Sequence, residues 1–309
     1  INGESLLYLR PRKENNMFKK TAIIAGIGLA LSATAQADYR WELGAGYSDG
    51  TVDSELKTNA GNEKNSNDAN VWDVSGIWYM ETVDTSKGPL GEAAFLDHAS
   101  DVTIGYSDGE VDFSNFDDQD GSTYSISSRY VAEGPGWKLS GWLVDLGYER
   151  REPGDQEVDF YNIGIGKYVT PNTTVVFNYD RIDVNNGDDT NGYGLDIDHF
   201  FAFSSSGGIK ASVNGGKVVV SGADDVEEYG LGATWYIGNN WGIGAGYQNI
   251  SQDGYEVAGY AANVEWFITE NFAVDLAYEE ADPDTIDYGS GARLETEIDA
   301  VSLSALYRF

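Results

Sequence analysis

The strongest constraint on this chain is a two-residue periodicity that returns in one segment after another. In residues 229–237, YGLGATWYI, one set of alternate positions holds Tyr, Leu, Ala, Trp and Ile, and the other holds Gly, Gly, Thr and Tyr. The same alternation recurs in residues 39–48, 241–249, 272–280 and 301–309. Because successive side chains of a β-strand point to opposite faces, each segment is expected to form a strand with one apolar and one small or polar face.

Aromatic residues frame the apolar face of these strands, with small aliphatic residues between them. This arrangement is typical of a lipid-facing band bounded by aromatic girdles. The opposite face carries Gly, Ser, Asp and Asn, which are too small and too polar to fill a dry core, so we expect water there. The residues that we assign to the girdles are Tyr39, Trp41, Tyr47, Trp235, Trp241, Tyr247, Trp266, Phe272, Tyr278, Tyr307 and Phe309.

We count about fourteen such strands of about ten residues each, which suits a barrel with an even strand number. The predicted fold is all-β, a transmembrane antiparallel up-and-down β-barrel of about 14 strands, with 12 or 16 as alternatives. The expected spans are 39–48, 71–82, 100–107, 123–132, 137–150, 158–169, 173–183, 193–203, 208–220, 228–237, 241–249, 256–268, 272–280 and 295–309.

The connections predict an orientation. Short turns alternate with longer acidic segments such as 49–69 and 108–122, and barrels of this kind place short turns on the periplasmic side and long loops outside. Residues 83–99 break the rule, because a long connection falls where a short turn belongs. We expect a brief helix from Leu90 to His98 on the periplasmic side.

Composition removes several function classes. The chain has 51 acidic and 19 basic residues and a formal net charge of −32, so it lacks the clustered cations that bind nucleic acid. It has no Cys and only two His, which excludes disulfide frameworks, thiolate metal sites and Cys nucleophiles. We therefore expect no catalytic residues, no metal site and no cofactor.

The N-terminal region has the three parts of a secretory signal peptide. Met17 begins a stretch with two lysines, an apolar run and an A-x-A site, so we expect residues 17–37 to be removed by cleavage between Ala37 and Asp38. Residues 1–16 precede the first Met and are interpreted as an upstream start that is not native to the protein. The barrel domain is then 38–309, exported to the cell envelope.

Strand parity also predicts which charged residues line the interior. The inward set contains Arg40, Arg129, Lys210 and Arg308, against Glu42, Asp73, Glu81, Asp101, Asp145, Glu149, Asp180, Asp196, Asp198, Glu265, Asp275 and Glu279. An acidic pore wall favours cations, so we expect weak cation selectivity. The alternative is that these positions are merely solvated. Whether the loop carboxylates bind divalent ions stays open.

An enzyme barrel is the rival class. The sequence Asp196-Ile-Asp198-His199 resembles the Asp and His pairs that activate water as a general base. Parity argues against this role, because His199 falls on the face opposite Asp196 and Asp198.

Several motifs together resemble the family of putative general bacterial porins of Gram-negative outer membranes. They are the opening YRWELGAGY, the stretch from Val83 to Leu96 with its GPLGEAAFL sequence, the turn FITENF and the terminal YRF, and the likeness covers essentially all of 38–309. The resemblance implies a passive diffusion channel for ions and small hydrophilic solutes, inserted by the barrel-assembly machinery, which reads a C-terminal strand ending in an aromatic residue.

The expected surroundings of such a channel are outer-membrane lipid and lipopolysaccharide. The sequence leaves open the pore diameter, the preferred solute, a constriction loop and whether the barrel forms a homotrimer. The alternative function is a narrow or closed barrel that acts as a structural protein, adhesin or receptor through its extracellular loops.

Overall fold

The computed structural model describes residues 38–58, 61–112, 119–132, 140–154, 156–185, 189–220, 225–287 and 293–309. The predicted signal peptide and the residues before it lie outside these ranges. Nearly all described residues lie in antiparallel strands: β1 (Tyr39–Thr58), β2 (Gly61–Val83), β3 (Asp101–Asp112), β4 (Gln119–Val131), β5 (Trp142–Pro153), β6 (Val158–Thr170), β7 (Thr173–Val184), β8 (Thr190–Ala202), β9 (Gly208–Val219), β10 (Val226–Ile237), β11 (Trp241–Gln252), β12 (Tyr255–Thr269), β13 (Phe272–Pro283), β14 (Ile286–Asp287) and β15 (Arg293–Arg308).

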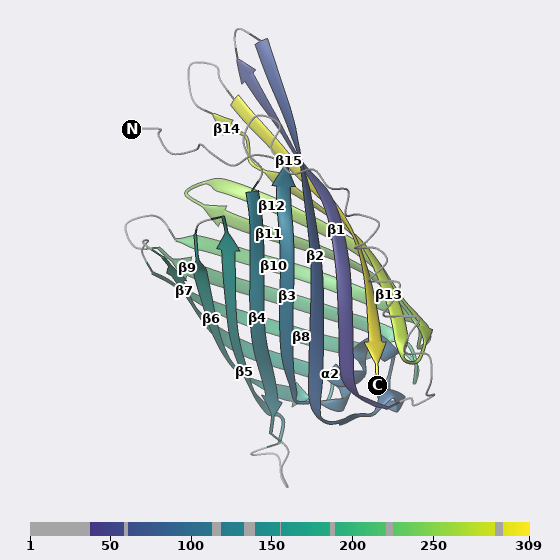
Figure 1. Ribbon diagram of the computed structural model, residues 1–309. Helices are drawn as coiled ribbons and strands as arrows, with labels where there is room; N and C mark the ends of the chain where they lie inside the picture. Colours follow the sequence, from purple (N-terminus) through teal and green to yellow (C-terminus); the bar gives the residue numbers. More distant parts are fainter. Residues whose placement is uncertain are drawn as a thin grey trace.

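The sheet closes into a barrel (Figure 1). Each strand pairs with its neighbours in the chain, and β15 pairs with both β13 and β1. The two-residue β14 extends the line of β13 along β15, so the barrel itself has 14 strands. The predicted all-β, antiparallel up-and-down barrel of 14 strands is therefore confirmed.

The strands run further than the sequence pattern predicts at the end where the long loops lie. The sequence pattern predicts a loop over 49–69, but β1 continues to Thr58 and β2 begins at Gly61. The two strands form a hairpin that projects beyond the barrel (Figure 1). The prediction is wrong here because apolar alternation ends where the lipid-facing band ends. Backbone hydrogen bonding needs no apolar face and continues past that point.

Hairpin turns at the loop end can also be very tight. β11 and β12 are joined by Asp253 and Gly254, which have φ values of 50° and 75°. Two consecutive positive φ values are the requirement of a two-residue type I′ turn, which Asp-Gly meets at low steric cost.

The connection between β2 and β3 is the main departure from a simple meander. It contains the 3₁₀ turns η1 (Thr85–Lys87) and η2 (Leu90–Glu92) and the short helix α2 (Ala93–Asp97). We call residues 84–100 the plug segment. Figure 1 shows α2 inside the lower end of the barrel, so the predicted brief helix is present but lies within the barrel mouth. None of the described helices is long and apolar enough to span a membrane.

Candidate functional site

The interior of the barrel is hollow and polar above the plug segment. One hollow of about 330 Å³ lies against β5 to β10 and is lined by carboxylates, amides and glycines from alternate positions. Among its lining residues are Asp145, Asp180, Asp196 and Glu228. The register places these side chains on one face of the sheet, and Asp145, Asp180 and Asp196 are among the residues predicted to point inward.

The basic residues of the interior are paired with carboxylates. Arg129 forms a two-point contact with Asp145, at 2.8 and 2.7 Å, across the β4–β5 pair. Arg151 Nε lies 2.5 Å from Glu149, and its guanidinium covers the Phe160 ring. In these ion pairs the carboxylates neutralise the positive charges of Arg129 and Arg151 on the inner wall.

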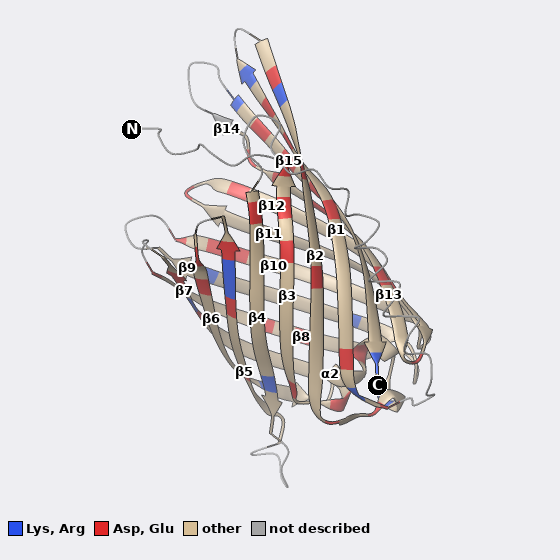
Figure 2. Cartoon of the chain, in the orientation of Figure 1, with Lys and Arg blue, Asp and Glu red and all other residues tan. Residues whose placement is uncertain are grey.

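Many acidic residues of the interior have no such partner. Among the described residues, no basic side chain forms an ion pair with Asp73, Asp180, Asp196, Asp198, Glu228, Asp275 or Glu279. Amides and hydroxyls contact several of them instead: Asn162 donates to Asp180 at 2.6 Å, and Ser212 donates to Asp198 at 2.6 Å. Acidic positions occur on strands around the barrel (Figure 2). The described wall therefore carries an excess of negative charge.

The tip of the plug segment reaches the wall opposite its own strands. In a ring of fourteen strands, β9 and β10 lie seven positions from β2 and β3. Glu92 at the tip lies 3.2 Å from Lys210 Nζ on β9, and it accepts a hydrogen bond of 2.7 Å from Tyr236 on β10. The backbone N–H of Leu90 donates to Asn239 O at 3.0 Å in the turn after β10. The plug segment thus spans the diameter of the barrel.

One flank of the plug segment rests on an enclosed arginine. Arg308 donates to Glu42 at 2.7 Å and to the carbonyl oxygen of Leu90 at 2.9 Å. Its guanidinium lies 4.4 Å from the Tyr39 ring centre and 4.5 Å from the Phe267 ring centre. This flank is filled by charge pairing and by apolar contacts of Leu90 with Phe267.

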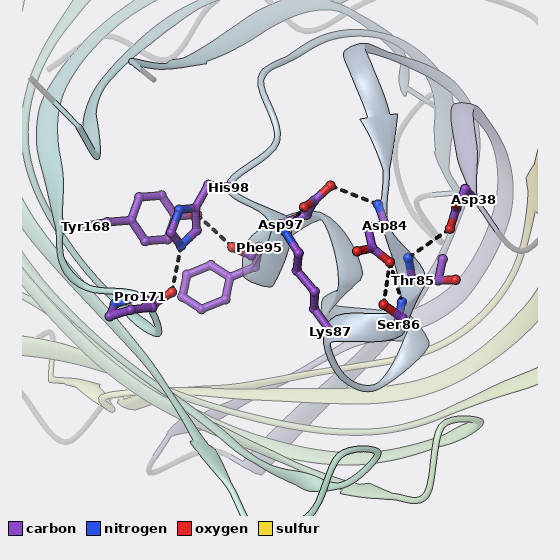
Figure 3. A network of polar contacts seen from close by, with 10 residues as sticks. All are labelled: Asp38, Asp84, Thr85, Ser86, Lys87, Phe95, Asp97, His98, Tyr168 and Pro171. Carbon is purple, nitrogen blue, oxygen red and sulfur yellow. Dashed lines mark hydrogen bonds and ion pairs between the residues drawn. The ribbon is translucent and has the colours of Figure 1, made fainter. Parts of the chain in front are cut away.

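The other flank is filled mainly by rings. Tyr168 on β6 donates to the carbonyl oxygen of Phe95 at 3.0 Å, and its ring lies 3.9 Å from the His98 ring, centre to centre. His98 Nε2 lies 2.7 Å from the Pro171 carbonyl oxygen in the β6–β7 turn. Figure 3 shows these residues side by side inside the ring of strands.

The two ends of the plug segment are tied to each other. Asp84 accepts hydrogen bonds from the backbone N–H and the hydroxyl of Ser86, and these lower the pKa of the Asp84 carboxyl. Asp97 pairs with Lys87 and accepts from the Asp84 backbone N–H at 2.8 Å (Figure 3). At the tip the environment is drier, and burial raises the pKa of Glu92 above its ordinary value.

The outer surface carries two bands of aromatic rings. Toward the loop end, neighbouring strands bring rings together, including Trp72 with Tyr106 and Tyr247 with Tyr260, both at 5.3 Å between ring centres. Toward the plug end, Trp241 stacks on Trp266 at 5.0 Å. Of the residues assigned to the girdles from sequence, Trp41, Trp235, Trp241, Trp266, Tyr278 and Phe309 are exposed on this surface.

Tyr39 is not a girdle residue, and that prediction is wrong. Its side chain is 1% exposed and packs with Tyr79, Val83 and Ala93 at the plug segment. The cause is a register shift between Tyr39 and Trp41 in the pairing of β1 with β2. An extra residue at such a bulge reverses the face of the sheet to which each earlier side chain of the strand points.

The same shift moves Arg40 out of the predicted pore wall. The Arg40 side chain donates to the carbonyl oxygens of Tyr79 and Met80 at the end of β2 and is exposed. Trp41 is exposed as well, and Glu42 is the next residue of β1 that faces the interior. Arg40 is therefore a backbone contact at the barrel edge.

The structure also adds residues that the sequence analysis missed. Glu92, Phe95 and Tyr236 join the plug segment to the wall, and Arg151 and Glu228 belong to the inner surface. Glu228 has the same parity as Gly230 and Gly232, so extending the alternation of 229–237 by one residue would have found it. No local signal shows that residues 84–100 fold into the barrel, because the partners that hold them are far away in the sequence.

The two histidines are separated from the acidic hollow. His199 Nδ1 and the Thr173 hydroxyl share a hydrogen bond of 2.7 Å. The centre of the His199 ring lies 4.1 Å from that of the Phe201 ring. Its neighbour Asp196 lines the hollow, so the two side chains lie on opposite faces as parity predicts. Within the described ranges, no group of three His, Asp or Glu side chains is arranged to hold a metal ion.

Comparison with known proteins gives a family and a fold. A family model described as putative general bacterial porin matches residues 19–215. The outer membrane protein Omp33 of Acinetobacter baumannii has 19% identity and a TM-score of 0.56, covering 88% of this chain and 99% of Omp33. A deltaS2 mutant of the TodX monoaromatic hydrocarbon channel has 9% identity and a TM-score of 0.52, and the match covers 88% of this chain and 91% of the TodX chain. No curated protein matches the chain.

Proposed function

The chain belongs to the family of putative general bacterial porins, and on this premise we propose that it is an outer-membrane channel that conducts ions and small hydrophilic solutes with a weak preference for cations. The outer surface has the apolar band and aromatic girdles that lipid requires. The interior has the polar, hydrated wall that solutes require.

The preference for cations is supported by one observation. The interior arginines and lysine form ion pairs with carboxylates, whereas Asp180, Asp196 and Asp198 have no basic partner among the described residues. Unpaired carboxylates at close range lower the free energy of a cation in the lumen and raise that of an anion. The preference is weak where the lumen is wider than the Debye length of about 8 Å at physiological salt.

The proposed setting follows from the same features. The plug end faces the periplasm and the β1–β2 hairpin faces outward, among outer-membrane lipid and lipopolysaccharide. The last strand, β15, is followed by Phe309, whose exposed ring stacks on the buried Tyr307 ring and offers the barrel-assembly machinery an aromatic residue beside this strand. Export depends on the signal peptide that ends at Ala37.

Single-channel recording tests the function. The refolded chain is inserted into planar bilayers, and a salt gradient is imposed across the membrane. We expect discrete current steps and a reversal potential of the sign that cation preference produces. A reversal potential of the opposite sign contradicts the selectivity. Persistent silence of folded protein contradicts the channel and favours the closed structural or receptor barrel, which the plug segment across the mouth makes the natural second candidate.

A further inference from the structure

The tip of the plug segment docks against the wall with no spare room. A Cβ atom added at Gly91 would lie 2.4 Å from Glu265 Oε2 and 2.9 Å from Tyr236 Cε1. The Tyr236 ring is held by its hydrogen bond to Glu92, whereas Glu265 Oε2 is the far end of a flexible side chain. A larger residue at this position therefore requires the Tyr236 ring or the tip itself to move.

The seat beneath the tip contains polar groups that gain from contact with water. Tyr39 Oη is buried and has no hydrogen-bond partner in the described part of the chain. Glu42, Glu92 and Arg308 are each about 5% exposed. The desolvation of these charges and the unpaired hydroxyl of Tyr39 offset part of the stabilisation that ion pairs and apolar contacts give the docked plug segment.

The contacts of the plug segment are unevenly placed along it. Its two ends continue into β2 and β3, and Asp84, Lys87 and Asp97 brace them together beside those strands. The tip, in contrast, meets the far wall through Glu92 and the backbone N–H of Leu90, while the Leu90 carbonyl oxygen accepts from Arg308 on β15. A movement that frees the tip must also release Phe95 from Tyr168 and Leu96 from Phe200, while the two ends of the segment stay attached to their strands.

We propose that the plug segment is a gate, which closes the periplasmic mouth when its tip is docked on β9 and β10 and opens it when the tip swings free. The proposal rests on the proposed channel function. It makes the docking of Gly91 and its neighbours, rather than the width of the barrel, the step that sets how much of the time the lumen conducts. The acidic wall above the gate then selects among solutes that the gate admits.

A matched pair of glycine substitutions tests the gate. Gly91→Val places a branched side chain where the docked tip has no space. Gly232→Val is the control, because a Cβ at this interior glycine has one neighbour within 4 Å, the carbonyl oxygen of Ala245 at 3.9 Å. We expect a severalfold rise in open probability for Gly91→Val and wild-type behaviour for Gly232→Val. Equal open probability in the two variants overturns the gate.

A reversible lock tests the same step in the other direction. The Leu90→Cys/Asn239→Cys pair joins backbones that share a 3.0 Å hydrogen bond, close enough for a disulfide. The chain has no other Cys. Oxidation should abolish most of the current, and reduction should restore it in the same bilayer. A current that is indifferent to oxidation, with the disulfide verified by mass, overturns the gate.

Folding of each variant is checked by the difference in gel mobility between heated and unheated barrel. If all folded variants are silent, Gly91→Val included, the channel function fails and the gate with it. If wild type and Gly91→Val conduct equally and steadily, the channel stands and only the gate fails.

Discussion

Arg308 and Glu42 form an ion pair of 2.7 Å between β15 and β1, at the seam where the barrel closes, and both side chains are enclosed beneath the plug segment. The pair joins the last strand to the first and also carries the plug segment, because Arg308 donates a second hydrogen bond to Leu90 O. Arg308 therefore stabilises both the closure of the barrel and the docked position of the plug segment.

Loss of one member of this pair should be costly. Glu42→Gln leaves the buried Arg308 charge without its partner, and removing one side of a buried pair typically costs about 3–5 kcal/mol. The double variant Glu42→Leu/Arg308→Met leaves no uncompensated charge and should recover part of that loss. Urea unfolding in lipid vesicles measures both. Equal destabilisation of the single and double variants would show that the charge is not the cause.

Acid should favour the docked plug segment. Burial raises the pKa of Glu92 in the docked state, so the docked state holds the proton more tightly than the free one. The resulting stabilisation is complete below the ordinary carboxyl pKa and is lost as pH rises through the raised value. We expect open probability to fall as pH is lowered from neutrality towards the ordinary carboxyl pKa.

Glu92→Gln is the control for this pH dependence. The charged and titratable groups that face Glu92 are Lys210 and Tyr236 in direct contact, with Asp198 and Glu265 further away. Because they remain in the variant, Glu92→Gln should flatten the pH response without removing it entirely. An unchanged response assigns the titration to another group.

Neutralising the acidic hollow should weaken cation preference. Asp180 and Asp196 line the hollow without basic partners, and Asp180→Asn/Asp196→Asn keeps the shape while removing two charges. The reversal potential in a salt gradient should move towards zero, with a smaller shift for each single variant. Asp49→Asn removes an exposed carboxylate from the opposite face of β1 and should leave the reversal potential unchanged. Equal shifts for the two faces would contradict the assignment.

Lysine substitutions at two neighbouring positions should show which face of the barrel contacts lipid and which contacts water. Leu276 is 54% exposed on the outer surface, and the next residue, Ala277, faces the interior beside Asn263. Leu276→Lys should destabilise the barrel in lipid by about 2–4 kcal/mol, as for a lysine near the bilayer midplane. Ala277→Lys should cost much less because its ammonium stays hydrated. A larger destabilisation by Ala277→Lys than by Leu276→Lys would contradict the assignment of the outer face to lipid.

Much of this architecture could be predicted from local pattern. The alternation in residues 229–237 has a period of two, and that period fixes both the strand and its two faces. The same rule separated His199 from Asp196 and placed Asp145 and Arg129 inward, where the structure pairs them. Strand ends were less predictable, since β1 and β2 continue in water after the apolar signal has stopped.

The errors and omissions have two physical origins, a local break in register and contacts between residues far apart in the chain. Parity counting assumes an unbroken register, and the shift near Tyr39 reversed the positions of Tyr39 and Arg40. The plug segment is held by Lys210, Tyr236 and Arg308, which lie more than a hundred residues away in the chain. Contacts with such distant residues do not produce a periodic pattern in the sequence of the segment that they stabilise.

Liposome swelling tests the central claim most directly, because it measures solute entry through the lumen itself. Liposomes that contain the folded chain are diluted into isotonic solutions of uncharged solutes of increasing size. The account predicts swelling that slows as solute size increases, and faster swelling with Gly91→Val than with Gly232→Val. Absence of swelling for every solute, in wild type and in Gly91→Val alike, would contradict it.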